Sequence, residues 1–218
     1  MAQDIQSVPR SHEQAEKAYD SMSRWYDMFA GSEKKFTDIG LQMIAVQPGE
    51  DVLEIGCGTG QALIELGTAS QNGKVMAVDI SQGMIHIAQK RVRKAGLEHI
   101  ITLQKGDATS LTYPEASFDA VFISFTLELF DNPEIPIVLG ECHRVLRQGG
   151  RLCVVSLEKG ESLMVKLYEW GHDRWPEMLD CRPIYTHTAI EKAQFRVQEM
   201  KKKVMWGLPV AIVLAEKK

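Results

Sequence analysis

Hydrophobic and polar positions change their period along this chain, and the changes mark the expected helices and strands. Across Gln14–Phe29, and again from about Lys34 to Val46, apolar residues recur every three or four positions, which is typical of amphipathic helices. We therefore expect two N-terminal helices, followed by the turn pair Pro48-Gly49. Residues 1 to about 12 carry no such period and are expected to form a loose arm.

Beyond Pro48, short apolar runs alternate with amphipathic segments. Five runs predict buried strands, at Asp51–Ile55, Lys74–Val78, Ile100–Gln104, Phe118–Ser124 and Arg151–Leu157. Helices are predicted at Gly60–Leu66, Gln82–Lys94 and Ile135–Leu146. Strands that alternate with helices predict a parallel sheet with helices on both faces and right-handed crossovers.

The end of the chain follows a different pattern. Phe195–Trp206 and Val210–Ala215 are predicted strands, and only Gly207-Leu208-Pro209 separates them. So short a connection cannot be a crossover, so it must close an antiparallel hairpin. Before the hairpin, residues 159 to about 189 form a long irregular insertion with four aromatic residues, Tyr168, Trp170, Trp175 and Tyr185. These aromatics either line an acceptor pocket or cover the open end of the sheet.

Composition and charge exclude several classes of function. With 218 residues, of which 44% are hydrophobic, the chain is of ordinary size for one domain. The net charge of −4 gives no basic field for nucleic acid. The four cysteines lack metal-ligand spacing, so we expect buried thiols, no metal and a cytoplasmic location. No apolar run has the length of a membrane span, and the N-terminus has no signal-peptide core.

The first predicted strand runs into a glycine-rich turn, Gly56-Cys57-Gly58-Thr59-Gly60. Its spacing is not the G-x-G-x-x-G of dinucleotide-binding proteins, which argues against an NAD-dependent oxidoreductase. Three glycines allow a tight turn that comes close to a ligand. Acidic Glu54 lies just ahead of the turn, and a carboxylate there favours a positively charged ligand over a pyrophosphate. In a second interpretation, Glu54 only accepts hydrogen bonds from neighbouring backbone.

Candidate ligand-binding residues also follow the next strands. Asp79 ends the second strand, near the spacing of about 20 residues at which an acidic residue meets ribose hydroxyls. Asp107 and the Ala108 amide, after the third strand, suit the amino group and a ring nitrogen of adenine. Met84 supplies an apolar wall. Because the carboxyl ends of parallel strands meet at one edge, these residues predict a site for a nucleoside with a charged tail that is not a phosphate.

Four motifs in order resemble the class I S-adenosylmethionine (SAM)-dependent methyltransferases: VLEIGCGTG (52–60), VMAVDIS (75–81), GDATSLTYPEASFDAVFISFTLELF (106–130) and ECHRVLRQGGRLCVVSLE (141–158). The resemblance implies an α/β, doubly wound, Rossmann-like sheet of seven strands in the order 3-2-1-4-5-7-6, the last strand antiparallel. It implies one domain, with an N-terminal helical lid over 1–48, a SAM-binding core over 49–158, an acceptor-site insertion over 159–188 and the C-terminal hairpin over 189–218.

Within that class, the segment Tyr19–Met28 and the run FDAVFISFTLELF resemble the ubiquinone/menaquinone-biosynthesis methyltransferases. The resemblance implies SAM as cofactor, S-adenosylhomocysteine as product and a quinone-like small molecule as acceptor. The insertion departs from that group, so an amine or phospholipid headgroup stays open as acceptor. A SAM-binding protein without catalysis is the alternative from another class. The resemblance implies Thr59, Asp79, Asp107, Ala108 and Ser124 as cofactor contacts. With the residues singled out from the sequence itself, the full set of candidates is Glu54, Gly56, Gly58, Thr59, Gly60, Asp79, Ile80, Met84, Asp107, Ala108 and Ser124.

Catalytic residues are sought in the lid and the insertion. Tyr26 is the first candidate and Tyr19 the second, as aromatic residues that face cofactor and acceptor from the first helix; in the alternative they only pack in the core. His172 and His187 are candidates for a general base. We expect no transmembrane segment, leave transient membrane contact open, and expect a monomer or homodimer.

Overall fold

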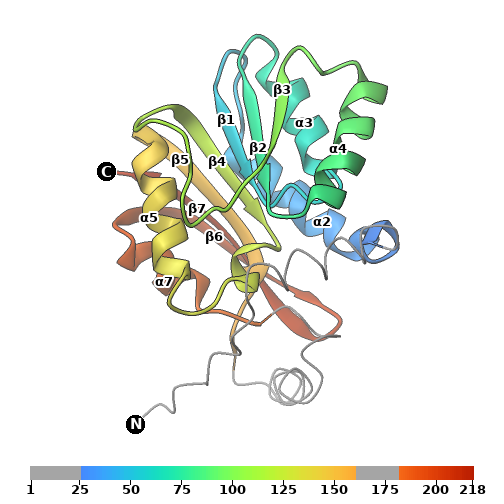
Figure 1. Ribbon diagram of the computed structural model, residues 1–218. Helices are drawn as coiled ribbons and strands as arrows, with labels where there is room; N and C mark the ends of the chain where they lie inside the picture. Colours follow the sequence, from blue (N-terminus) through green and yellow to red (C-terminus); the bar gives the residue numbers. More distant parts are fainter. Residues whose placement is uncertain (1–25, 161–181) are drawn as a thin grey trace.

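A computed structural model describes residues 26–160 and 182–218, with side chains from residue 31 onward. The strands of these ranges form one sheet in the order β3-β2-β1-β4-β5-β7-β6 (Figure 1). They are β1 Val52–Ile55, β2 Val75–Asp79, β3 Ile101–Lys105, β4 Phe118–Ser124, β5 Leu146–Leu157, β6 Phe195–Met205 and β7 Leu208–Lys217. Strands β1 to β5 pair in parallel, and β7 is antiparallel to β5 and β6. The expected sheet order and antiparallel end are confirmed.

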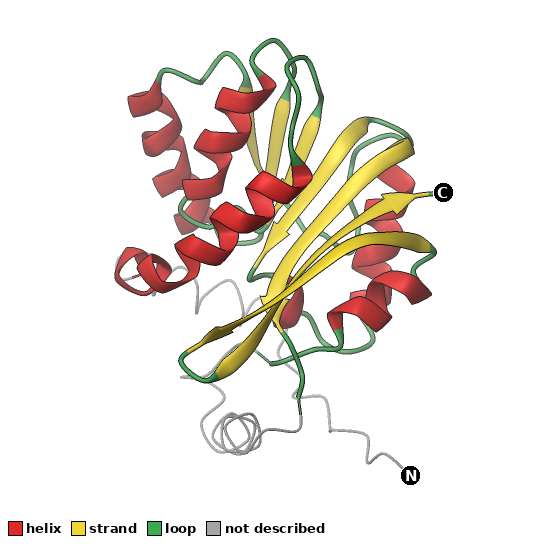
Figure 2. Ribbon diagram, turned by 180° about the vertical axis from the view of Figure 1, so that it is seen from behind, coloured by secondary structure: helices red, strands yellow, loops and turns green. Residues whose placement is uncertain are grey.

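Helices cover both faces of this sheet. Helices α2, α3 and α4 lie on one face, and α5 and α7 lie on the other (Figures 1 and 2). Their bounds are α2 Tyr26–Ile44, α3 Gln61–Ser70, α4 Gln82–Ala95, α5 Ile135–Val145 and α7 Thr186–Lys192, and a 3₁₀ turn, η1, covers Leu127–Leu129. In the described ranges, no helix is both long and apolar enough to cross a membrane.

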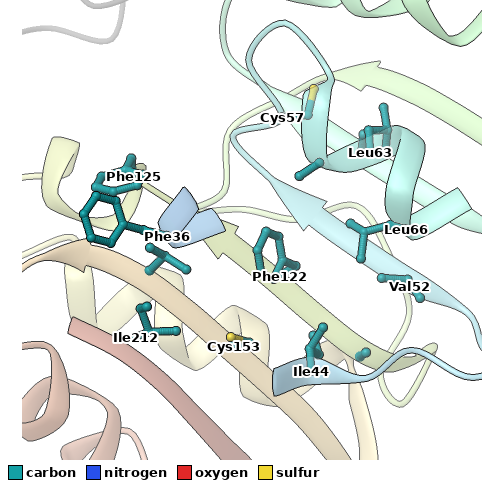
Figure 3. Packing of buried hydrophobic residues seen from close by; sticks show 14 of the residues in the cluster. Phe36, Ile44, Val52, Cys57, Leu63, Leu66, Phe122, Phe125, Cys153 and Ile212 are labelled. Atoms are coloured by element: carbon teal, nitrogen blue, oxygen red, sulfur yellow. The ribbon is translucent and has the colours of Figure 1, made fainter. Parts of the chain in front are cut away.

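Side chains alternate between two cores along each strand, as the period of two requires. On β4, Phe122 belongs to the cluster under α2, α3 and α4, whereas Val121 and Ile123 belong to the cluster under α5 and α7. Figure 3 shows Phe122 in the first cluster together with Ile44 of α2 and Leu66 of α3. Because both faces of the strand are buried, the runs are apolar throughout rather than alternating.

The prediction of two separate N-terminal helices is wrong in one respect, because no break separates Phe29 from Lys34. Helix α2 runs without interruption from Tyr26 to Ile44. It includes Gly31, a residue that costs a helix about 1 kcal/mol relative to alanine. That cost is outweighed by the packing of the apolar face of α2, which buries Phe36 and Ile44. The part of the first helix before Tyr26 lies outside the described residues.

Close contacts hold α2 on the sheet. A Cβ at Gly40 would lie 2.6 Å from Cγ2 of Val155, so only glycine allows this approach without displacement. Cys153 Sγ lies 3.4 Å from the Gly40 carbonyl oxygen. At the end of the helix, Arg151 Nε of β5 donates to the Ile44 carbonyl over 2.9 Å. Helix α2 is therefore fixed across β4 and β5.

The insertion was expected to stay irregular to about residue 189, and this is wrong for its end. Helix α7 begins at Thr186, and Ile184 forms a parallel bridge with Glu158. The Thr186 amide donates to Glu158 Oε2 over 3.2 Å, so a buried carboxylate caps the helix start. That acceptor is distant in sequence, which is why the local pattern did not predict the helix.

Candidate functional site

The glycine turn between β1 and α3 has the left-handed backbone that favours glycine. Gly56 has φ 69°, and a Cβ there would lie 2.2 Å from Cγ2 of Thr126. Gly60 has φ 80°, and a Cβ there would lie 3.0 Å from that of Ala88 on α4. These two glycines therefore let the turn approach other parts of the chain, a role that the sequence had assigned to ligand approach alone.

Asp79, the last residue of β2, is tied to the glycine turn. Its Oδ2 accepts the Gly58 amide over 2.8 Å, and its Oδ1 accepts the Ser81 amide over 2.9 Å. Each carboxylate oxygen has two acceptor positions, and a carboxylate at a strand end can accept from several donors at once. The hydrogen bonds fix the side chain at the carboxyl edge of the sheet, where the sequence placed it.

A cavity of about 370 Å³ lies between α2 and the glycine turn. Five of the predicted cofactor residues line it: Glu54, Gly56, Gly58, Thr59 and Ser124. Helix α2 contributes Glu33, Lys34, Thr37, Asp38 and Leu41, and the rest of the wall is Cys57, Gln61, Ala62, Glu65 and Arg91. The structure thus joins the ends of β1 and β4 to a helix that the sequence identified as a lid.

Glu54 is the most unusual residue in this wall. Its side chain is 3% exposed, and its Oε2 atom has no hydrogen-bond partner. Burial, and secondarily the charge of Asp79, raise the pKa of Glu54 to about 8. A buried carboxyl without a partner costs free energy, and a cation in the cavity would supply the missing donor. The alternative role, as an acceptor for neighbouring backbone, leaves this oxygen unexplained.

Polar contacts link the walls of the cavity. The Thr37 and Ser124 hydroxyls lie 2.8 Å apart and join α2 to the end of β4. Lys34 on α2 pairs with Asp38 at 2.7 Å and reaches Glu65 of α3 at 3.4 Å. These contacts hold α2 against both the sheet and α3, so the helix closes one side of the cavity.

The turn is also held from α4. Arg91 Nη1 donates to the carbonyl oxygen of Thr59 over 2.8 Å and to its hydroxyl over 2.9 Å. Thr59 is only 3% exposed, so this contact fixes the side chain as well as the backbone. Neither Arg91 nor Thr37 was predicted from the sequence, because each acts through a residue distant in the chain.

The remaining predicted cofactor residues lie outside the cavity. Asp107 Oδ1 accepts the Thr109 amide over 2.8 Å, so it shapes the turn after β3. Met84 and Ala108 are buried, and Ile80 and Asp107 are partly exposed. The Gly106 amide donates to the Asp79 carbonyl over 3.0 Å, which places the turn after β3 beside the end of β2.

The structure describes only some of the predicted catalytic residues. Tyr26 is the first residue of α2, but its side chain is not described, and Tyr19 and His172 lie outside the described residues. His187 lies on α7, 3.3 Å from Glu191, and its side chain is 40% exposed. Among the insertion aromatics only Tyr185 is described, and it is exposed. Within 26–160 and 182–218, no group of His, Cys, Asp and Glu could hold a metal ion.

A second buried acid, which the sequence pattern did not predict, follows β4. Glu128, in η1 after β4, is fully buried; its Oε1 accepts the Leu157 amide over 3.0 Å, and its Oε2 has no partner. Burial raises its pKa to about 8. Its position four residues after the end of β4 was the signal available in the sequence.

Comparison with known sequences gives consistent matches. Residues 52–150 match the family described as "Methyltransferase domain". The chain is 33% identical over 149 residues to a demethylmenaquinone methyltransferase from Symbiobacterium thermophilum, covering 68% of this chain and 58% of that protein. It is 28% identical over 167 residues to a 2-phytyl-1,4-naphtoquinone methyltransferase from Synechococcus elongatus, covering 73% and 71%. This chain spans less than two thirds of the length of the demethylmenaquinone relative.

Solved structures match over a larger part of the chain. The [4+2]-cyclase SpnF has a TM-score of 0.79 at 20% identity and covers 95% of this chain and 97% of that one. A putative methyltransferase from Bacillus halodurans has a TM-score of 0.71 at 16% identity, covering 83% and 98%. At these identities the likeness concerns the fold alone.

Proposed function

We propose that this chain, whose residues 52–150 match the methyltransferase-domain family, is a class I SAM-dependent methyltransferase that methylates a small apolar or amphipathic acceptor of the quinone type. The observation that carries the proposal is the unpartnered Oε2 atom of Glu54 in the wall of the glycine-turn cavity. A carboxyl group at this position would repel a phosphate and would attract a positively charged cofactor. The named activities of the sequence relatives support the quinone-like acceptor.

The residues of the site fit this cofactor. When bound, SAM supplies a methyl group that is activated by a positively charged sulfur. Glu54 would pair with the ammonium of the amino-acid end, and Gly58 with Thr59 would border it. Asp79 would accept from the ribose hydroxyls, while Asp107, Ala108, Ile80 and Met84 would hold the adenine.

The protein contributes mainly by positioning in this proposal. Methyl transfer between bound groups is accelerated by holding the acceptor in line and about 3 Å from the methyl carbon. Helix α2, tied to Ser124 through Thr37, would exclude water from one side of the site. Tyr26, and secondarily Tyr19, would contact the acceptor from the lid.

Calorimetry with SAM, S-adenosylhomocysteine and NAD tests the cofactor. We expect the first two to bind and NAD not to bind; binding of NAD alone would contradict the proposal. Transfer of a radiolabelled methyl group from SAM is then measured for two sets of candidate acceptors. One set contains demethylated naphthoquinols, and the other contains amines and phosphatidylethanolamine. SAM binding without transfer to any acceptor would favour the alternative of a non-catalytic SAM-binding protein.

Substitution of Tyr26 by phenylalanine tests its proposed role. Loss of the hydroxyl should lower turnover, by roughly 10-fold or more if the group contacts the reacting acceptor, with SAM affinity unchanged. Unchanged turnover would show that Tyr26 only packs. A monomeric or homodimeric state and a cytoplasmic location stay predictions, which gel filtration and cell fractionation can test.

A further inference from the structure

The β6–β7 hairpin projects past its neighbouring strand at the edge that carries the candidate site. Strand β5 runs parallel to β1 and β4 and ends at Leu157, which pairs with Val210 of β7. The Glu158 amide donates to the Pro209 carbonyl over 2.8 Å. Across β7, Lys201–Lys203 lie level with the last residues of β5, and residues 204–208 reach beyond it. Figure 2 shows the hairpin extending from the sheet.

The turn of this hairpin contains a residue that the fold does not require. Met205 pairs with Leu208, so Trp206 and Gly207 form a two-residue loop, with φ of 51° and 84°. Two positive φ angles define the type I′ hairpin turn, in which asparagine or glycine is favoured at the first position. Trp206 adopts this backbone at a steric cost, and its side chain is 66% exposed. Against the described residues, 26–160 and 182–218, the indole ring is not buried in a way that offsets the cost.

The residues before Trp206 combine apolar and basic side chains. Val204 is 63% exposed, and Lys201, Lys202 and Lys203 are all exposed. Lys201 pairs with Glu199 at 3.2 Å and Lys202 approaches Glu158 at 3.8 Å, which leaves a net positive hairpin end on a chain of net charge −4. Lysines on an edge strand also prevent edge-to-edge pairing, but that role does not account for an exposed tryptophan.

We propose that this hairpin tip, residues 201–206, docks the protein onto an anionic phospholipid surface. Tryptophan prefers the interface of a bilayer, where its ring is apolar and its N–H reaches polar groups. Lysines beside it are attracted to anionic headgroups, and each contributes on the order of a five-fold gain in binding. A second copy of this chain is a poorer occupant, because two such tips repel each other.

Docking at this tip would turn the candidate site toward the membrane. The tip lies at the carboxyl edge of the sheet, the edge that also holds the glycine turn and Glu54. The remainder of the chain carries net negative charge and is repelled by the same surface, which favours one orientation. The proposal stands on the hairpin alone and does not depend on the methyl acceptor.

Vesicle co-flotation without cofactor or acceptor tests the docking surface. We expect binding to phosphatidylglycerol-containing vesicles and at least about 10-fold weaker binding to pure phosphatidylcholine. Binding should fall between about 0.1 M and about 1 M salt, because the Debye length shortens from roughly 10 to roughly 3 Å. Trp206→Asn should weaken binding about 10-fold while keeping or raising the melting temperature, since asparagine suits the turn.

Lysine variants supply the matched control. The pair Lys201→Gln and Lys203→Gln should weaken binding roughly 25-fold, whereas Lys90→Gln with Lys94→Gln on exposed α4 positions should leave it unchanged. The proposal is overturned if the wild-type protein does not bind anionic vesicles at low salt, or if Trp206→Asn binds them as tightly as the wild type. It is also overturned if the wild type is a dimer and Trp206→Asn is a monomer, because the tip would then hold a second copy of the chain. Methyl-transfer assays are read separately, so either proposal can fail without the other.

Discussion

Glu54 shows how a single residue acquires its chemistry from its surroundings. It follows Leu53 in a strand whose four residues are all buried, so its carboxyl group is shielded from bulk water. Desolvation then disfavours the charged form, and the nearby charge of Asp79 adds to the effect. A bound cation would reverse this balance, which makes ligand binding and ionisation of Glu54 parts of one equilibrium.

Affinity for SAM should therefore depend on pH. Because the pKa of Glu54 is about 8 in the free protein and a cation favours the carboxylate, binding releases a proton at neutral pH. Affinity should rise with pH from about 6 to about 8 and then level off. Titration calorimetry in buffers of different ionisation enthalpy measures the released proton directly.

Glu54→Gln should weaken SAM binding and should abolish the pH dependence of that binding. Loss of a charge-assisted hydrogen bond costs about 1.5–3 kcal/mol, or roughly 10- to 100-fold in affinity. The remaining affinity should no longer depend on pH between about 6 and 8. Glu65→Gln is the matched control, because Glu65 lines the same cavity but its side chain is 51% exposed; its affinity should stay near wild type. An unchanged pH profile in Glu54→Gln would contradict the assignment.

At the scale of elements, helix α2 illustrates how packing overrides local sequence. Its two glycines have opposite environments: nothing lies within 4 Å of a Cβ at Gly31, whereas Val155 blocks one at Gly40. The helical period identified the two flanking segments, but the continuous helix across Gly31 depends on the packing of α2 against the sheet, where Phe36 and Ile44 are buried. Gly40 instead determines how closely the helix approaches β5.

We expect substitution of these two glycines by alanine to change the free energy of unfolding in opposite directions. Gly31→Ala should raise the free energy of unfolding by up to about 1 kcal/mol, because alanine is the better helix former at an open position. Gly40→Ala should lower it by about 1–3 kcal/mol, because the added methyl overpacks against Val155. Denaturant unfolding of both variants measures the difference. Equal effects would show that α2 is not packed as described.

For the molecule as a whole, buried acids link stability to pH. Glu128 has a pKa of about 8 when folded and is expected to have its ordinary value when unfolded. Between those values the folded state retains a proton that the unfolded state loses, so stability falls as pH rises. His143 acts in the opposite direction, since burial lowers its pKa below the ordinary value of 6.5.

A comparison of wild type with Glu128→Gln isolates this contribution. The neutral amide has no proton to lose, so the stability of the variant relative to wild type should rise with pH, by up to ~1.4 kcal/mol per pH unit between about 5 and 8. Above about pH 8 the difference should be constant. Thermal or denaturant unfolding across this range measures it, and a difference that does not change with pH would refute the burial of an ionisable Glu128.

The sequence by itself determined the strands, most helices, the sheet order through the family resemblance, and the identity of the glycine turn. These follow from local periodicity and from motifs that lie within single segments, such as the run from Val52 to Gly60. Only the tertiary structure decided that Thr126 fills the space beside Gly56, that Arg91 fixes Thr59, and that α2 closes the cavity. These contacts join residues far apart in the chain, and the burial that leaves Glu54 and Glu128 each with an unpartnered oxygen arises only when the elements pack together.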